Sequence, residues 1–144
     1  MAHGCMPEEG ANPVVAAGEV IVACRQLEAA IQAERPRHPL LGAFYLTPTV
    51  ALMGQREQGN VIPASAEIFL DIRTTSEHEH GDIRERIGAA IAGAVASVAG
   101  VAHEIEVMDD RPATETAPDD PIVLALVDAQ RALTGRAPEF GGVP

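Results

Sequence analysis

The ten residues from Ala64 to Arg73, ASAEIFLDIR, decide the fold of this chain, because apolar side chains recur at every second position. From Ala66 to Ile72 these apolar residues alternate with glutamate, phenylalanine and aspartate. A period of two is that of a β-strand, whose successive side chains point to opposite faces. The stretch therefore predicts a strand with one face in the core and a more polar face outside, as in an antiparallel sheet.

A second strand is predicted just upstream. The residues from Thr49 to Met53, TVALM, are β-branched or apolar, as strand residues usually are. The polar stretch from Gly54 to Asn60, GQREQGN, contains two glycines and predicts a turn. The two strands are therefore expected to form a half-buried antiparallel pair.

A long helix is predicted before this pair. Asn12 and Pro13 suit its start, because asparagine accepts hydrogen bonds from free backbone N–H groups and proline fits the first helical turn. Arg35-Pro36 suits its end, since the residue before a proline is pushed out of helical geometry. One apolar stripe recurs along it at helical spacing, formed by Val20, Cys24, Leu27 and Ile31.

A second helix is predicted over residues 82–98. Asp82 and Glu85 have the spacing of a capping box, and Gly100 follows the predicted end. Its buried stripe is expected to consist of Ile83, Ile87, Ile91, Val95 and Val98. A helix before the strands and another after them indicate an α+β domain.

The rest of the chain predicts one more strand, a linker and one more helix. Alternation from His103 to Val107 predicts the strand, with His103 packed beside the sheet. Residues 111–121, RPATETAPDDP, predict the linker, and 122–133 predict the helix. If residues 1–5 supplied an initial strand, the order would be βαββαβ, that of a ferredoxin-like α+β fold whose first strand is largely missing.

The charge of the 144-residue chain excludes several classes of partner. Its formal net charge is −11, and all ten basic residues are arginine. No basic cluster is present to neutralise a row of phosphates, and an acidic surface repels anionic lipid, so we expect neither nucleic acid nor membrane as a partner. The start of the chain has no signal-peptide pattern, and Cys5 and Cys24 are too few for a disulfide scaffold. We therefore expect a cytoplasmic protein.

Metal-site patterns are weak. His78-Glu79-His80 lies in a predicted turn, and we interpret it as a solvated run, because a zinc site needs three or four convergent ligands. His3 and Cys5 form another short pair, but Cys24, the second cysteine, lies on an apolar stripe and is interpreted as buried and inert. Spacing alone thus predicts an α+β domain without a metal site.

Short motifs in one order along nearly the whole chain carry a family resemblance. They are AHGCMP at 2–7, GAN at 10–12, NVIP at 60–63, DIR at 71–73, RPA at 111–113, PDDP at 118–121, TGR at 134–136 and GGVP at 141–144. Together they resemble the lid, or dimerisation, domain of the zinc-dependent amidohydrolase and metallopeptidase family and its return into the catalytic domain. That family includes acetylornithine deacetylase, succinyl-diaminopimelate desuccinylase, aminoacylase and the glutamate carboxypeptidases.

The resemblance implies hydrolysis of an amide in a small N-acylated amino acid or peptide, with two zinc ions in a separate catalytic domain. It implies that His3 stabilises the tetrahedral oxyanion, often across a homodimer. It also implies that Asn60 and Arg73 bind the substrate carboxylate, and that Gly142 belongs to a glycine-rich substrate loop. From spacing alone, Arg73 could instead form a surface ion pair with Asp71.

The resemblance also divides the chain. Residues 1–110 are expected to be the lid, and residues 111–144 a linker and the start of a truncated catalytic part. The family's metal ligands fall outside the sequence, so we expect this chain alone to be inactive and to bind no zinc tightly. The alternative is a stand-alone ferredoxin-like module that binds a small molecule or dimerises without catalysis.

Overall fold

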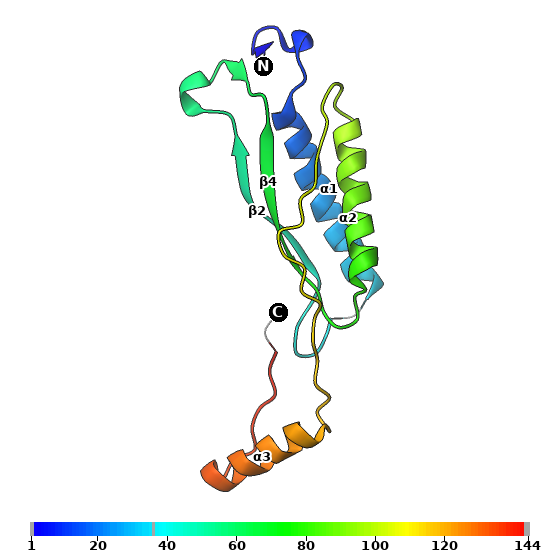
Figure 1. Cartoon of the computed structure of the whole chain (residues 1–144), viewed down its shortest axis with the longest axis vertical. Helices are drawn as coiled ribbons and strands as arrows, with labels where there is room; N and C mark the ends of the chain where they lie inside the picture. Colours follow the sequence, from blue (N-terminus) through cyan, green and yellow to red (C-terminus); the bar gives the residue numbers. More distant parts are fainter. Residues whose placement is uncertain (1, 36, 143–144) are drawn as a thin grey trace.

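An antiparallel pair of strands with two helices on one face forms the body of the protein (Figure 1). The computed structural model describes residues 2–35 and 37–142. The strands are β2 (Tyr45–Met53) and β4 (Ala66–Arg73). The helices are α1 (Pro13–Glu34) and α2 (His80–Ala96), which pack against each other. The α+β class predicted from the sequence is confirmed.

Helix α1 begins and ends where its sequence predicts. The Asn12 side chain accepts hydrogen bonds from the backbone N–H groups of Val14 and Val15, and Pro13 occupies the first turn. Arg35 is extended and ends the helix, while Pro36, the predicted cause, lies outside the described residues. The helix therefore depends on local capping signals as well as on its buried stripe.

Helix α2 begins two residues earlier than predicted, and its cap is a different residue. The Glu79 carboxylate accepts a hydrogen bond of 2.7 Å from the Asp82 backbone N–H. Asp82 therefore lies in the first turn, and the predicted capping box with Glu85 is wrong. This N–H and that of Gly81 lower the pKa of Glu79, as expected for a carboxylate at a helix N-terminus. Gly100, just beyond the helix, has a φ of 75°, which favours glycine.

Strand β2 is four residues longer at its start than TVALM predicts. It pairs with β4 from Tyr45↔Arg73 to Met53↔Ala66, and the register shifts between Pro48 and Val50. A proline cannot donate a ladder hydrogen bond and is tolerated at an edge strand or a bulge. Both conditions hold for Pro48, since β2 pairs only with β4 among the described residues.

The core lies between the two helices and the inner face of the β2–β4 pair. It contains the predicted stripes of both helices, together with side chains from the connection after α1 and from β2. The fully buried members are Cys24, Ile31, Phe44 and Leu46. Ile68 and Leu70 of β4 pack against it as the alternation in ASAEIFLDIR predicts, whereas Ile72, predicted on the same face, is 39% exposed.

A second, smaller sheet forms at one end of the body. It consists of β1 (Ala2–His3) and β3 (Val61–Ile62), paired antiparallel. The short 3₁₀ helices η1 (Pro7–Glu9) and η2 (Arg56–Gln58) lie beside it in the sequence. The initial strand thus exists, but it pairs with β3 and not with the main sheet.

The predicted strand from His103 to Val107 is wrong. Residues 101–117 are extended but pair with no strand among the described residues, and His103 is exposed instead of packed beside the sheet. A side-chain pattern can make a segment strand-like, but a strand also needs a neighbour for its backbone hydrogen bonds. The ferredoxin-like order is therefore incomplete in this chain.

Helix α3 (Pro121–Thr134) follows the extended segment and extends away from the body (Figure 1). The Asp120 side chain accepts from the Ile122 backbone N–H at its start, and Gly135, with a φ of 70°, ends it as predicted. None of its residues is buried, although Ile122, Leu124 and Leu126 are apolar. Among the described residues, no helix is long and apolar enough to cross a membrane.

Candidate functional site

The small sheet brings two predicted site residues together. His3 in β1 pairs with Val61 in β3, and the Gly4 backbone N–H donates to the Asn60 carbonyl oxygen at 2.7 Å. The side chains of His3 and Asn60 then meet, with 3.1 Å between His3 Nε2 and Asn60 Nδ2. Two motifs 57 residues apart in sequence therefore present an imidazole and a carboxamide side by side.

The contacts of the His3 ring indicate which nitrogen holds the proton. The Cys5 backbone N–H lies 3.4 Å from Nδ1 and can only donate to it. In the neutral ring the proton is then on Nε2, which faces Asn60. The amide of Asn60 accepts this proton when its oxygen, and not its nitrogen, points to the ring; the two orientations have nearly the same shape. His3 can thus present an N–H donor.

Gly4 has a structural role that the sequence analysis did not assign. A Cβ at this position would lie 3.1 Å from the Asn60 carbonyl oxygen, closer than most Cβ contacts. A side chain here would push the end of β1 away from the turn before β3, which carries Asn60. The only signal available was the position of Gly4 inside the AHGCMP motif.

Arg73 lies at the opposite end of β4 from this pair. The strand is eight residues long and spans about 24 Å at a rise of about 3.4 Å per residue. Asn60 precedes its first residue, Ala66, and Arg73 is its last. In one protomer the three predicted side chains therefore do not converge. Arg73 Nε donates to Asp71 Oδ2 at 3.0 Å, so the surface ion pair considered from spacing is present.

Gly142 lies at the same end of the body as Arg73. Its nearest neighbours are Leu41 and the backbone oxygen of Leu40, in the connection between α1 and β2. A Cβ on Gly142 would overlap with the Leu41 side chain, so the close approach depends on glycine. His3 and Asn60 are thus in contact near one end of the β2–β4 pair, while Arg73 and Gly142 both lie toward the other end.

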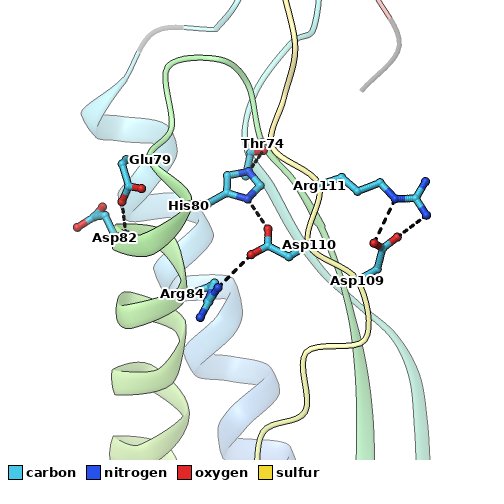
Figure 2. Close-up of polar contacts among 8 residues, drawn as sticks. All are labelled: Thr74, Glu79, His80, Asp82, Arg84, Asp109, Asp110 and Arg111. Carbon is cyan, nitrogen blue, oxygen red and sulfur yellow. Dashed lines mark hydrogen bonds and ion pairs between the residues drawn. The ribbon is translucent and has the colours of Figure 1, made fainter.

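A polar cluster near the start of α2 holds the extended segment that follows that helix. Figure 2 shows His80 between Thr74 and Asp110, with 2.9 Å from Nε2 to Thr74 Oγ1 and 2.6 Å from Nδ1 to Asp110 Oδ1. Arg84 donates to the other oxygen of Asp110 at 3.0 Å. His80 is therefore not part of a solvated run, and the interpretation of His78-Glu79-His80 as one is wrong.

His80 and, to a lesser extent, Arg84 lower the pKa of the Asp110 carboxyl by hydrogen bonding. A lowered pKa means that the folded state favours the carboxylate. Its contribution to stability is thus present above the pKa of the unfolded carboxyl and is lost as the pH falls through the folded value. The contact of His38 Nε2 with Glu115 at 3.2 Å holds the same segment farther along.

We expect His80→Ala to raise the pKa of Asp110 toward its ordinary value, and Arg84→Ala to raise it less, because His80 is the stronger cause. Carbon-detected NMR titration of the Asp110 carboxyl measures both shifts. The control is His103→Ala, which removes an exposed histidine and should leave the titration unchanged. An unaltered Asp110 titration in His80→Ala would show that this contact does not form in solution.

The described residues do not form a site for the zinc implied by the resemblance. Within 2–35 and 37–142, no group of three or more histidine, cysteine, aspartate or glutamate side chains is placed to hold a metal ion. Cys5 is exposed and Cys24 is buried, and neither forms a disulfide. Burial raises the pKa of the Cys24 thiol, which makes it a poorer metal ligand. No reaction step is therefore derived through a metal held by this chain.

The sequence matches one known protein family. The family described as the peptidase dimerisation domain matches residues 1–98, more than half of the chain. This range contains both sheets, α1, α2, His3, Asn60 and Arg73, and leaves out the segment with α3 and Gly142. No curated protein and no solved structure matches the chain. On the strength of the family match and the α+β body that it covers, the chain belongs to the peptidase dimerisation domain family.

Proposed function

We propose that this chain is the lid and dimerisation module of a zinc-dependent amide hydrolase that acts on N-acyl amino acids or small peptides. The observation that carries the proposal is the contact between His3 and Asn60, which joins two motifs of the resemblance in one small sheet. The family match to a peptidase dimerisation domain supports a hydrolase parent and a dimer.

His3 is proposed to donate a hydrogen bond to the oxyanion that forms when the amide carbonyl is attacked. Its Nε2–H faces Asn60, and the ring is held at Nδ1 by the Cys5 backbone N–H, so a bound oxyanion would share this donor with Asn60. A donor oriented before the reaction stabilises the charge that develops in the transition state without having to reorganise. Asn60 orients this ring and offers its own amide to the substrate.

Arg73 is proposed to bind the substrate carboxylate. A planar guanidinium matches a carboxylate with two parallel charge-assisted hydrogen bonds. Arg73 already binds a carboxylate, that of Asp71, and both side chains are about half exposed. A substrate carboxylate can therefore share or replace this partner at the sheet end where Gly142 also lies.

The distance between the two pairs of residues is best explained by a homodimer. In a two-fold pair with antiparallel edge strands, the start of one strand lies beside the end of the other. If two β2 strands paired this way, His3 and Asn60 of one protomer would approach Arg73 and Gly142 of the other. Such a dimer would bring together, across its interface, the residues that lie far apart within one protomer.

Two surfaces support dimerisation through this edge. Strand β2 has no partner on its other side among the described residues, and an unpaired edge is a template for pairing. Helix α1 exposes Val15 and Val22, seven residues apart on one face, with Gly18 between them. A small residue between apolar ones allows close approach of a second helix.

The remaining parts of the proposal concern the parent enzyme. Two zinc ions and the water-activating groups would belong to a catalytic domain outside this chain, and residues 111–144 to the linker and the start of that domain. The apolar residues that α3 leaves exposed support this division, because a catalytic domain would cover them. Two unpaired cysteines support a reducing, cytoplasmic compartment.

We expect Arg73→Ala in the parent enzyme to raise KM about 10- to 100-fold for N-acyl amino acids with a free carboxylate, since it removes hydrogen bonds to a charged group. The corresponding amides, which lack that charge, should be hydrolysed at unchanged rates. Steady-state kinetics on paired acids and amides measures the difference.

Arg111→Ala is the matched control, because Arg111 pairs with Asp109 two residues away, just as Arg73 pairs with Asp71. It should alter neither substrate class. If Arg73→Ala slowed acids and amides equally, Arg73 would not be the carboxylate-binding residue.

A further inference from the structure

A cavity of about 410 Å³ lies where the end of α1 meets the start of β2. A pocket of this size lies within the range of about 300–1,000 Å³ typical of small-molecule sites. It lies at the sheet end where Tyr45 pairs with Arg73, although neither Arg73 nor Gly142 is among the residues that line it. The residues that line it are Glu28, Ile31, Gln32, Arg35, Arg37, Ala43, Phe44, Tyr45 and His78.

Two arginines give this cavity a positive side. Arg35 and Arg37 form no ion pair with the residues that the structure describes, in a chain with 21 acidic residues. The nearby carboxylate of Glu34 is held by both guanidinium nitrogens of Arg86, at 2.7 Å each. Two guanidinium groups at one cavity without a described counter-ion favour an anionic ligand.

The one carboxylate in the lining, that of Glu28, already accepts two hydrogen bonds. Glu28 Oε1 accepts from Gln32 Nε2 at 3.1 Å, and Glu28 Oε2 accepts from the Leu46 backbone N–H at 3.3 Å. Gln32 Nε2 also donates to the Phe44 carbonyl at 2.7 Å. Glu28 and Gln32 therefore connect α1 to the start of β2, and the charge of Glu28 offsets only one of the two arginine charges in the lining.

His78 adds an unused hydrogen-bond donor. The Thr75 backbone N–H donates to His78 Nδ1 at 3.2 Å, which places the ring proton on Nε2. His78 Nε2 is buried and has no hydrogen-bond partner. Burial and, next, the charge of Arg35 lower the pKa of His78, so the ring is neutral at pH 7 and Nε2 is an N–H donor. Buried donors without an acceptor are uncommon and call for an explanation.

The inner wall of the cavity is apolar. Phe44 and Ile31 are 2% and 1% exposed, and the ring of Phe44 lies 5.4 Å from that of His78, centroid to centroid. In front of these covered side chains, the partly exposed Ala43 and Tyr45 offer the surface on which a small apolar body can pack while its charge stays near the arginines. The lining therefore suits a small organic anion better than a bare ion.

We propose that this cavity is a binding site for a small carboxylate with a short aliphatic body. Arg35 and Arg37 bind the carboxylate, His78 Nε2–H donates to one of its oxygens, and the body packs on Ala43 and the ring of Tyr45. The site lies on one protomer, uses none of the residues assigned to the hydrolase site, and shares with Arg73 the end of the sheet where β2 begins.

The test is a titration of the 144-residue chain with pentanoate, acetate, inorganic phosphate and neutral pentanamide. It is followed by NMR of the His78 ring and by calorimetry. We expect pentanoate to bind most tightly and to shift the His78 resonances, acetate to bind more weakly, and pentanamide not to bind. Tighter binding of phosphate than of pentanoate would overturn the choice of a carboxylate.

Arg35→Gln and Arg37→Gln should each weaken pentanoate binding about tenfold or more, since each removes a charge-assisted contact. Both side chains are exposed, and thermal melting checks that the variants stay folded. Arg25→Gln, an exposed arginine of α1 outside the cavity, is the matched control and should bind as the original chain does. Unchanged affinity in the two cavity variants, or no pentanoate binding at all, would overturn the proposal.

Discussion

Replacing His3 with alanine in the parent enzyme is expected to lower kcat by about 10²- to 10³-fold, the usual cost of removing one oxyanion donor. His3 is exposed and lies in a two-residue strand away from the core, so the loss should not come from unfolding. KM should change little, because the hydrogen bond is strongest in the transition state. Steady-state kinetics with circular dichroism of the variant measures both parts of the prediction.

The control for His3→Ala is His103→Ala. His103 is an exposed histidine in the extended segment, and its removal should leave kcat unchanged. A second control, Gly4→Ala, should reduce kcat by displacing Asn60 without removing the imidazole, because its Cβ would press on the Asn60 carbonyl. If His3→Ala raised KM alone, the residue would bind the substrate and not stabilise the oxyanion.

A mixture of two impaired variants, assayed on an acid substrate well below the original KM, shows whether the site is shared between protomers. In a heterodimer of His3→Ala with Arg73→Ala, one of the two shared sites has both original residues, and the other has neither. Random mixing makes half of the dimers mixed, so about one quarter of the original activity should return. If His3 and Arg73 served the same protomer, the mixture would stay as impaired as the two variants alone.

Much of the fold follows from local signals in the sequence. Asn12 caps α1, Asp120 caps α3, and Gly135 ends α3 in the left-handed conformation, as their residue types predict. Most of the predicted stripes of α1 and α2 and the middle of the inner face of β4 pack in the core as their periodicities indicate, whereas Val98 lies beyond the end of α2 and Ile72 is exposed. Such features depend on residues near each other in sequence. For these, capping chemistry gives the ends of the helix, and side-chain period gives the buried face.

The wrong predictions concern segments whose structure depends on residues distant in the sequence. The first half of β2 was not predicted, because it contains Pro48. A proline is uncommon in a strand except at a sheet edge or a bulge, and both occur here. His103 to Val107 has the right alternation but no strand beside it among the described residues. His80 looked solvated because its partner, Asp110, is 30 residues away in sequence.

The candidate site was only partly predictable for the same reason. Motif order assigned roles to His3, Asn60 and Arg73, which stay predictions. It did not indicate their separation along β4, which follows from the pairing of Tyr45 with Arg73 and Met53 with Ala66. No sequence motif indicates the cavity beside Arg35 and Arg37. Its lining comes from α1, β2 and the turn before α2, and those segments meet only in the folded chain.

Leu46→Ala is expected to destabilise the chain by about 2–5 kcal/mol, the range for removing a buried leucine side chain from a packed core. Leu46 is fully buried in the cluster that joins β2 to both helices. The neighbouring segments have little freedom to fill the space, because α1 and β2 are also connected by the Glu28 and Gln32 hydrogen bonds. Urea unfolding followed by circular dichroism gives the free energy of unfolding.

The matched control is Leu52→Ala, the same change on the same strand. Leu52 is 54% exposed on the outer face, so its loss in the monomer should be within about 0.5 kcal/mol. The two variants together test the register of β2 against β4, since a shift of one residue would exchange buried and exposed positions beyond the bulge. Equal destabilisation by both would contradict this register, and a larger effect of Leu52→Ala would place the core on the other face of the sheet.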